Sequence, residues 1–118
     1  MRWLVIPAVT LAVIATIACT PMNPHPMDMT QAVENAKSNT DHQALAAHYL
    51  EEAASLDKKA AEHKQLAAQY KARAYLYGKQ ADTFLQHCNL LIRNYEQAAD
   101  INRQMAKMHQ DMASGTAP

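Results

Sequence analysis

The sequence predicts an all-α protein made of long heptad helices, and two regularities support that prediction. Alanine doublets return every seven residues across positions 46–68, with larger side chains between them in an alternating 3-4 spacing. The same phase continues past Gly78, where apolar residues, most of them large, recur every seven residues as far as Met112. A sustained apolar seam with this spacing is typical of coiled-coil helices, which pack against each other along their length.

The expected seam has two positions in each half of the pattern. In the first half, the leading alanines Ala46, Ala53, Ala60 and Ala67 alternate with His42, Tyr49, Leu56, His63, Tyr70 and Tyr77. In the second half, one position is held by Phe84, Leu91, Ala98, Met105 and Met112, and the other by Ala81, Cys88, Tyr95, Asn102 and His109. A third row widens this stripe and consists of Leu85, Ile92, Ala99, Ala106 and Ala113.

Two architectures fit this pattern: an antiparallel helical hairpin that turns near Gly78, and a continuous coiled-coil rod that pairs with a second chain. The hairpin is favoured because folding back around Lys79 sets large side chains opposite alanines, such as Met112 opposite Ala46, and so fills the seam. In a parallel rod dimer, alanine layers would meet alanine. The apolar stripe is wider than a strict seam, so two hairpins could dimerise into a four-helix bundle.

The N-terminal region has a different composition from the heptad region. Residues 1–18 are expected to be a signal peptide, because Arg2 precedes a short apolar run that ends in small residues. Residues 19–40 form a proline- and methionine-rich tether and a short helix that Asp28 or Thr30 could cap. The hairpin is expected over 41–113, and 114–118 form a disordered tail. Capping boxes are expected at Thr40 with Gln43 and, after the turn, at Thr83 with Gln86.

The leader ends in an Ala18-Cys19 junction, which resembles the lipobox of bacterial lipoproteins. The resemblance implies that Cys19 receives a diacylglycerol and becomes the new N-terminus, and Thr20 after it implies the outer membrane. Thr16 stands where that family prefers leucine, and the alternative is an ordinary secretory signal with Cys19 unmodified. If Cys19 carries lipid, Cys88 is a packed thiol or an intermolecular partner; otherwise a Cys19–Cys88 disulfide could form.

A lipid-bearing cysteine followed by a heptad helix resembles the layout of small helical envelope lipoproteins, such as murein lipoprotein. That resemblance implies a helical protein held at the outer membrane and facing the periplasm. Murein lipoprotein ends in a lysine that joins peptidoglycan, whereas this chain ends in Pro118, so the linkage does not carry over.

The strongest chemical signal is the use of methionine and histidine. Met105, Met108, His109 and Met112 are spaced three or four apart, as on one helical face, and thioether and imidazole groups suit copper, especially Cu(I). In the expected hairpin, Tyr49 or His48 would lie near them. The competing interpretation is that these methionines only pack, because methionine is a common core filler.

The sequence also disfavours other functions. It holds no glycine-rich phosphate loop, His-Glu-x-x-His motif or paired-cysteine zinc pattern, so we expect no enzyme and no cofactor other than copper. The charges cancel and form no basic stripe, which argues against a nucleic-acid partner. The preferred interpretation is a lipid-anchored envelope interaction or structural module with a homo-oligomeric or other protein partner. The alternatives are a periplasmic copper or other soft-metal binder and a holdase-like stress protein.

Overall fold

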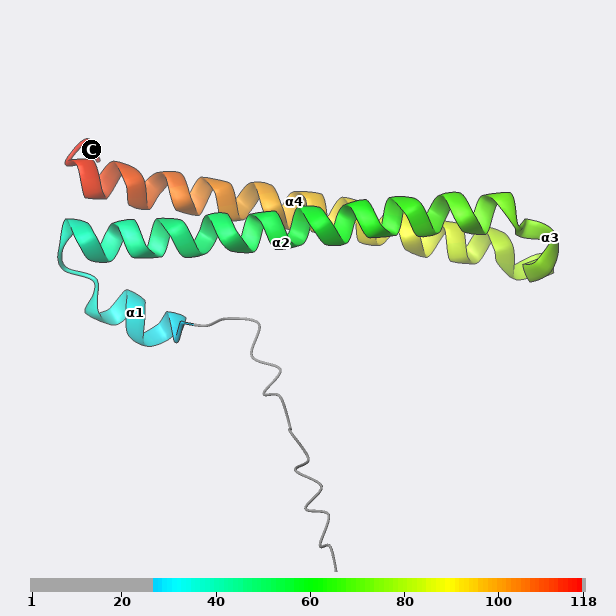
Figure 1. The fold of residues 1–118 in the computed structure, drawn as a ribbon, viewed down its shortest axis with the longest axis horizontal. Helices are drawn as coiled ribbons and strands as arrows, with labels where there is room; N and C mark the ends of the chain where they lie inside the picture. Colours follow the sequence, from blue (N-terminus) through cyan, green and yellow to red (C-terminus); the bar gives the residue numbers. More distant parts are fainter. Residues whose placement is uncertain (1–26, 118) are drawn as a thin grey trace, which may run out of the picture.

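The structure, a computed structural model, describes residues 27–117. The expected signal peptide, Cys19 and most of the expected tether lie outside the described residues. Within them the chain is all-α: α1 spans Met29–Asn35, α2 Asn39–Ala72, α3 Ala74–Tyr77 and α4 Ala81–Ser114, with a 3₁₀ turn, η1, at Gly78–Gln80 (Figure 1). The expected fold class is therefore confirmed.

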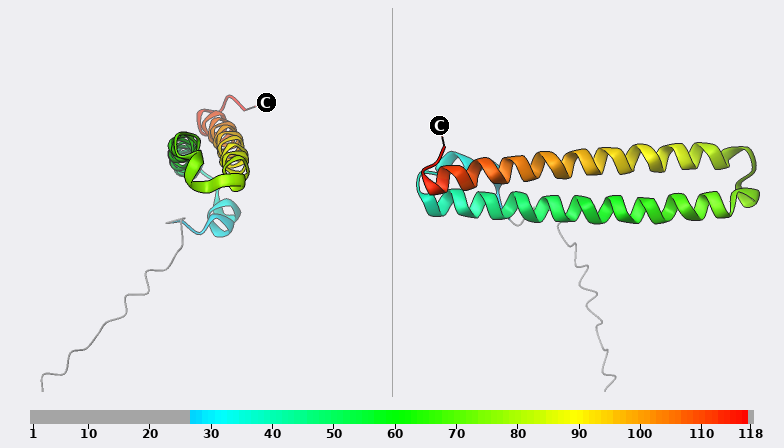
Figure 2. Two further views of the ribbon diagram at one scale, coloured as in Figure 1. Left: turned by 90° about the vertical axis from the view of Figure 1, so that its right-hand side faces the viewer. Right: turned by 90° about the horizontal axis from the view of Figure 1, so that it is seen from above.

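The two long helices, α2 and α4, lie side by side in opposite directions, as the views in Figures 1 and 2 agree. The antiparallel hairpin is thus confirmed, and the alternative of a continuous rod is wrong. The expected register also holds in the middle of the hairpin, where the ring of His63 stacks on Tyr95 with 5.5 Å between centroids. At the open end of the hairpin, α2 begins beside the last turns of α4.

A change of backbone direction at Arg73 and Gly78 makes the turn. Arg73 leaves the helical region with φ −113° and ψ 25°, which separates α2 from α3. Gly78 has φ 54° and ψ −131°, a backbone conformation that residues with a Cβ atom rarely adopt. Helix α4 then starts at Ala81 without a side-chain cap, so the expected capping box of Thr83 and Gln86 is wrong. The 3₁₀ turn already leads directly into the helix and leaves no extended N-cap residue for such a box.

Ser38 is the N-cap residue of α2 and forms the capping box with Asp41, so the expected box of Thr40 and Gln43 is wrong. The hydroxyl of Ser38 accepts a hydrogen bond from the backbone N–H of Asp41 at 3.1 Å. The Asp41 carboxylate in turn accepts from the backbone N–H groups of Ser38 at 2.9 Å and Lys37 at 3.0 Å. These bonds, the one from Lys37 foremost, lower the pKa of Asp41 from 3.8 to about 2.

This cap predicts a pH dependence of stability. The pKa of Asp41 is lower in the folded chain, so its contribution is present above the unfolded value of 3.8 and is lost as the pH falls through about 2. Asp41→Asn should therefore unfold at lower urea concentration than the wild type at pH 6, and the gap should shrink at pH 2. The exposed Glu62→Gln in the same helix is the control. A gap of equal size at both pH values would contradict the prediction.

The interface between α2 and α4 is built mainly from alanines, so the helices can approach closely. The buried apolar residues of the two helices include Ala46, Ala53, Leu56, Ala60, Ala81, Cys88, Ala99, Ala106 and Ala113. Within residues 27–117, Cys88 is buried and forms no disulfide. Near the turn, Phe84 stacks on Tyr70 with 4.8 Å between ring centroids.

The expectation that Leu91 and Met112 fill the seam is wrong. Leu91 is 36 % exposed and Met112 is 43 % exposed. The alanines of the third row, Ala99, Ala106 and Ala113, are buried instead, and together with the row of Ala81 and Cys88 they form the seam of α4. An antiparallel helix pair buries only two positions per heptad, so the remaining apolar row lies at the edge of the interface.

Candidate functional site

Two histidines from opposite ends of the hairpin sequence meet at its open end. The Nδ1 atoms of His42 in α2 and His109 in α4 are 3.1 Å apart, and the two rings stack with 5.3 Å between centroids. A neutral imidazole has one donor and one acceptor nitrogen, so one ring donates a hydrogen bond to the other. Tyr49 stacks on His109 at 5.6 Å with 8° between the ring planes. The three rings form what we call the His–Tyr cluster: His42, Tyr49 and His109.

The position of His109 between the helices affects its charge. Partial burial lowers the pKa of His109 below its usual 6.5, and the charge of the nearby His42 lowers it further by a smaller amount. His109 is therefore neutral at pH 7, with a lone pair on one ring nitrogen. His48, buried beside Tyr49, meets that ring edge-on with 5.9 Å between centroids.

The four residues that were expected to bind copper differ in burial. His109 points toward α2, as the ring contacts show, and the expected neighbour Tyr49 is confirmed. Met105 is half-buried, whereas Met112 is exposed and Met108 is 57 % exposed. Among residues 27–117, no group of three or more His, Cys, Asp or Glu side chains could hold a metal ion.

The contact of His42 with His109 was not predicted from the sequence. His42 precedes Tyr49 by one heptad and therefore lies on the same face of α2, and this signal was present in the sequence. The expected register placed His42 beyond the end of α4. The side chain of His109 reaches along the helix pair far enough to contact both rings.

A second feature is an apolar row along one edge of α4, next to its interface with α2. Its members recur at intervals of three, four or seven residues along one flank, and we call them the outer stripe: Leu91, Ala98, Ile101, Met105, Met108 and Met112. Ile101 is 51 % exposed, and Leu91, Met108 and Met112 are exposed as well. Met105 and Ala98 are half-buried, and Ala98 packs against the core. Exposed apolar rows of this length on a helix are typical of surfaces that bind another helix.

The opposite flank of the hairpin is charged. There Arg103 of α4 pairs with Asp57 of α2 at 2.7 Å, and Lys64 of α2 pairs with Glu96 of α4 at 2.5 Å. Exposed ion pairs of this kind contribute little stability, but they occupy the flank with solvated groups. The hairpin therefore has one charged and one apolar flank.

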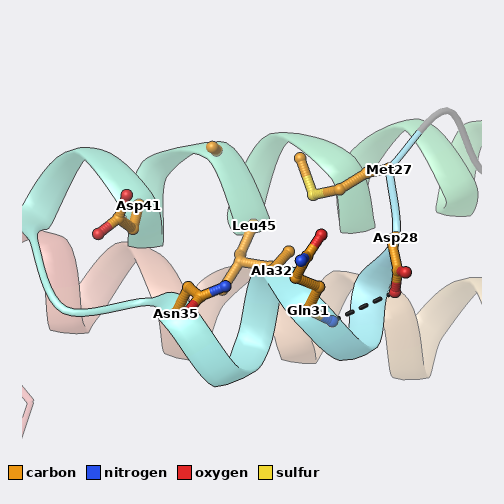
Figure 3. A pocket seen from close by; sticks show the side chains of 8 residues that line it. Met27, Asp28, Gln31, Ala32, Asn35, Asp41 and Leu45 are labelled. Carbon is orange, nitrogen blue, oxygen red and sulfur yellow. Dashed lines mark hydrogen bonds between the residues drawn. The ribbon is translucent and has the colours of Figure 1, made fainter.

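Helix α1 covers the start of α2 and leaves a shallow hollow between them (Figure 3). The Asp28 carboxylate caps α1 by accepting from the backbone N–H of Gln31 at 3.2 Å, so the expected cap at Asp28 is confirmed. Leu45, 1 % exposed, lies at the floor of this hollow beside Ala32. The hollow thus marks where α1 packs, and its lining shows no converging set of catalytic groups.

None of the helices in residues 27–117 combines the length and the apolar character that crossing a membrane requires. Comparison of the chain with protein-family models, with curated proteins and with solved structures found no match.

Proposed function

We propose that the chain is an envelope interaction module, held at the periplasmic face of the outer membrane by lipid on Cys19, whose helical hairpin binds other proteins. The observation that carries this proposal is the outer stripe of α4, which leaves large apolar side chains in water on one flank of a folded hairpin. The leader and its Ala18-Cys19 junction support the location. The anchor would keep the hairpin near the membrane, where partners are concentrated.

A second copy of the same chain is the partner that we propose. The hairpin core consists mainly of alanines, and small side chains bury little apolar surface, so a two-helix unit gains much from further burial. The outer stripe repeats at the spacing that another helix needs for side-by-side packing. The formal net charge of the chain is zero at pH 7, so two copies do not repel each other as a whole. Two hairpins joined along their apolar flanks would form a four-helix bundle.

The outer stripe is tested by adding charge to it. The double variant Ile101→Lys with Met108→Lys places two ammonium groups at exposed positions of the stripe, so it should remain helical but lose the dimer. Light scattering after gel filtration, on the mature chain with Cys19→Ser to remove the anchor, would measure the mass. We expect a dimer for the unaltered stripe at tens of micromolar and a monomer for the double variant.

The matched control adds the same charge to the other flank. Asn89→Lys with Gln110→Lys changes two exposed polar residues of α4 that lie on the side of the Arg103 ion pair. This control should remain dimeric. A monomer without any substitution in the stripe, or equal dissociation of both double variants, would refute the proposed dimer.

A further inference from the structure

The His–Tyr cluster has a geometry that suits a metal ion. A tetrahedral ion holds imidazole nitrogens at about 2.0–2.1 Å, which places two ligand nitrogens roughly 3.3 Å apart. The Nδ1 atoms of His42 and His109 are already 3.1 Å apart, although the two residues are 67 positions apart in the chain. An ion could thus enter between them with only a small adjustment of the two rings.

The residues around this pair indicate which metal it would take. Met105 precedes His109 by four residues and Met112 follows it by three, so each lies one helical turn away on the neighbouring surface of α4. Thioether sulfur is a soft ligand, and a set of imidazole and thioether groups favours Cu(I). We propose that His42 and His109 bind one Cu(I) ion through their Nδ1 atoms, with the thioether of Met105 or Met112 as a further ligand.

The protonation of the pair is compatible with this role. In the ion-free pair one Nδ1 carries the proton that the other accepts. Copper binding needs both Nδ1 lone pairs, so the donor ring must move its proton to Nε2, a change of tautomer that releases no net proton. The stacked Tyr49 holds the His109 ring in its orientation, as groups around a metal ligand commonly do.

Copper at this position would join the start of α2 to the end of α4. Both of these helix ends lie at the open end of the hairpin, and helix ends fray most easily. An ion that binds only the folded form stabilises that form by mass action. The proposed site would therefore couple copper to the closure of the open end. His42 and His109 lie outside the outer stripe, whereas the further ligand, Met105 or Met112, belongs to it. Because the titration below replaces only histidines to test the site, its outcome is separate from that of the dimer test.

The test is a Cu(I) titration of the mature chain against a colorimetric Cu(I) chelator under reducing, oxygen-free conditions. The protein carries Cys19→Ser and Cys88→Ala, so that no thiol competes for copper. We expect one tight equivalent and a rise in unfolding temperature on binding. His42→Phe and His109→Phe keep an aromatic ring for stacking but remove a metal ligand. Each should weaken Cu(I) binding by roughly 10- to 100-fold or more, because loss of a group that only supports a metal ligand already costs that much affinity.

His63→Phe is the matched control, because His63 is also half-buried between the helices and stacked on a tyrosine. The affinity of His63→Phe for Cu(I) should equal that of the parent protein. The double variant Ile101→Lys with Met108→Lys should also bind Cu(I) with the affinity of the parent protein. Circular dichroism on each variant checks that the helices remain. Equal affinity of the His42, His109 and His63 variants, or no binding tighter than micromolar by the parent, would overturn the site whatever the oligomeric state.

Discussion

Replacement of Cys19 by serine is expected to move the protein from the membrane fraction to the soluble fraction of a bacterial cell. Stable anchoring takes more than one acyl chain, each buried methylene contributing roughly 0.8 kcal/mol, and a lipoprotein cysteine carries several chains. Serine has no thiol to accept the diacylglycerol, so the single substitution should remove the entire contribution of the acyl chains to membrane binding. Fractionation followed by intact-mass measurement would check both the location and the modification.

The natural control for this experiment is the other cysteine. Cys88→Ala removes a buried thiol of α4 and should leave the protein in the membrane fraction with the same added mass. A wild-type protein found entirely soluble, with an unmodified N-terminus, would show that Cys19 is not lipidated. The proposed dimer would survive that result, because its test uses the anchor-free chain.

The fold could be predicted because a single property of the sequence determines most of it. A seam that keeps its phase from His42 to Met112 can be satisfied within one chain only by folding back near the middle, and Gly78 lies there. The pattern left the register open to a slip of one heptad, and the contact between His63 and Tyr95 confirms the register that turns near Gly78. The heptad period thus predicted both the elements and their antiparallel pairing.

Local details were harder to predict than the pairing. Ser38 with Asp41 and Thr40 with Gln43 are both plausible capping boxes, and they compete within six residues of chain. Likewise, three apolar rows on α4 compete for a two-position interface. The side-chain size of Leu91 and Met112 suggested core filling, but the close approach of alanine-rich helices places these side chains at the edge.

The candidate site was only half predictable for a related reason. The heptad pattern assigns each side chain to a face of its helix, and this assignment was enough to predict that His109 lies near Tyr49. The contact between His42 and His109 also depends on how far each ring extends along the helix axis, which the heptad pattern does not encode. The exposure of Met108 similarly depends on the rotation of α4 about its own axis.

Leucine in place of Ala53 is expected to lower the free energy of unfolding by about 1–3 kcal/mol, the usual cost of overpacking a well-filled interior. Ala53 is 2 % exposed and packs in the core cluster with Leu56 and Ala99, against the half-buried Tyr95. Three additional carbon atoms cannot fit there unless the two helices move apart. The effect is large because it acts in the buried core between α2 and α4.

The alanine doublet supplies its own control. Ala54 follows Ala53 in the same helix but is exposed, so Ala54→Leu should change the free energy of unfolding by no more than about 0.5 kcal/mol. Both variants make the same chemical change, so the helix propensity of leucine relative to alanine cancels between them. Urea denaturation followed by circular dichroism at low protein concentration would measure the difference. Equal losses for both variants would show that the leading alanines do not face α4, and would contradict the packing of the hairpin.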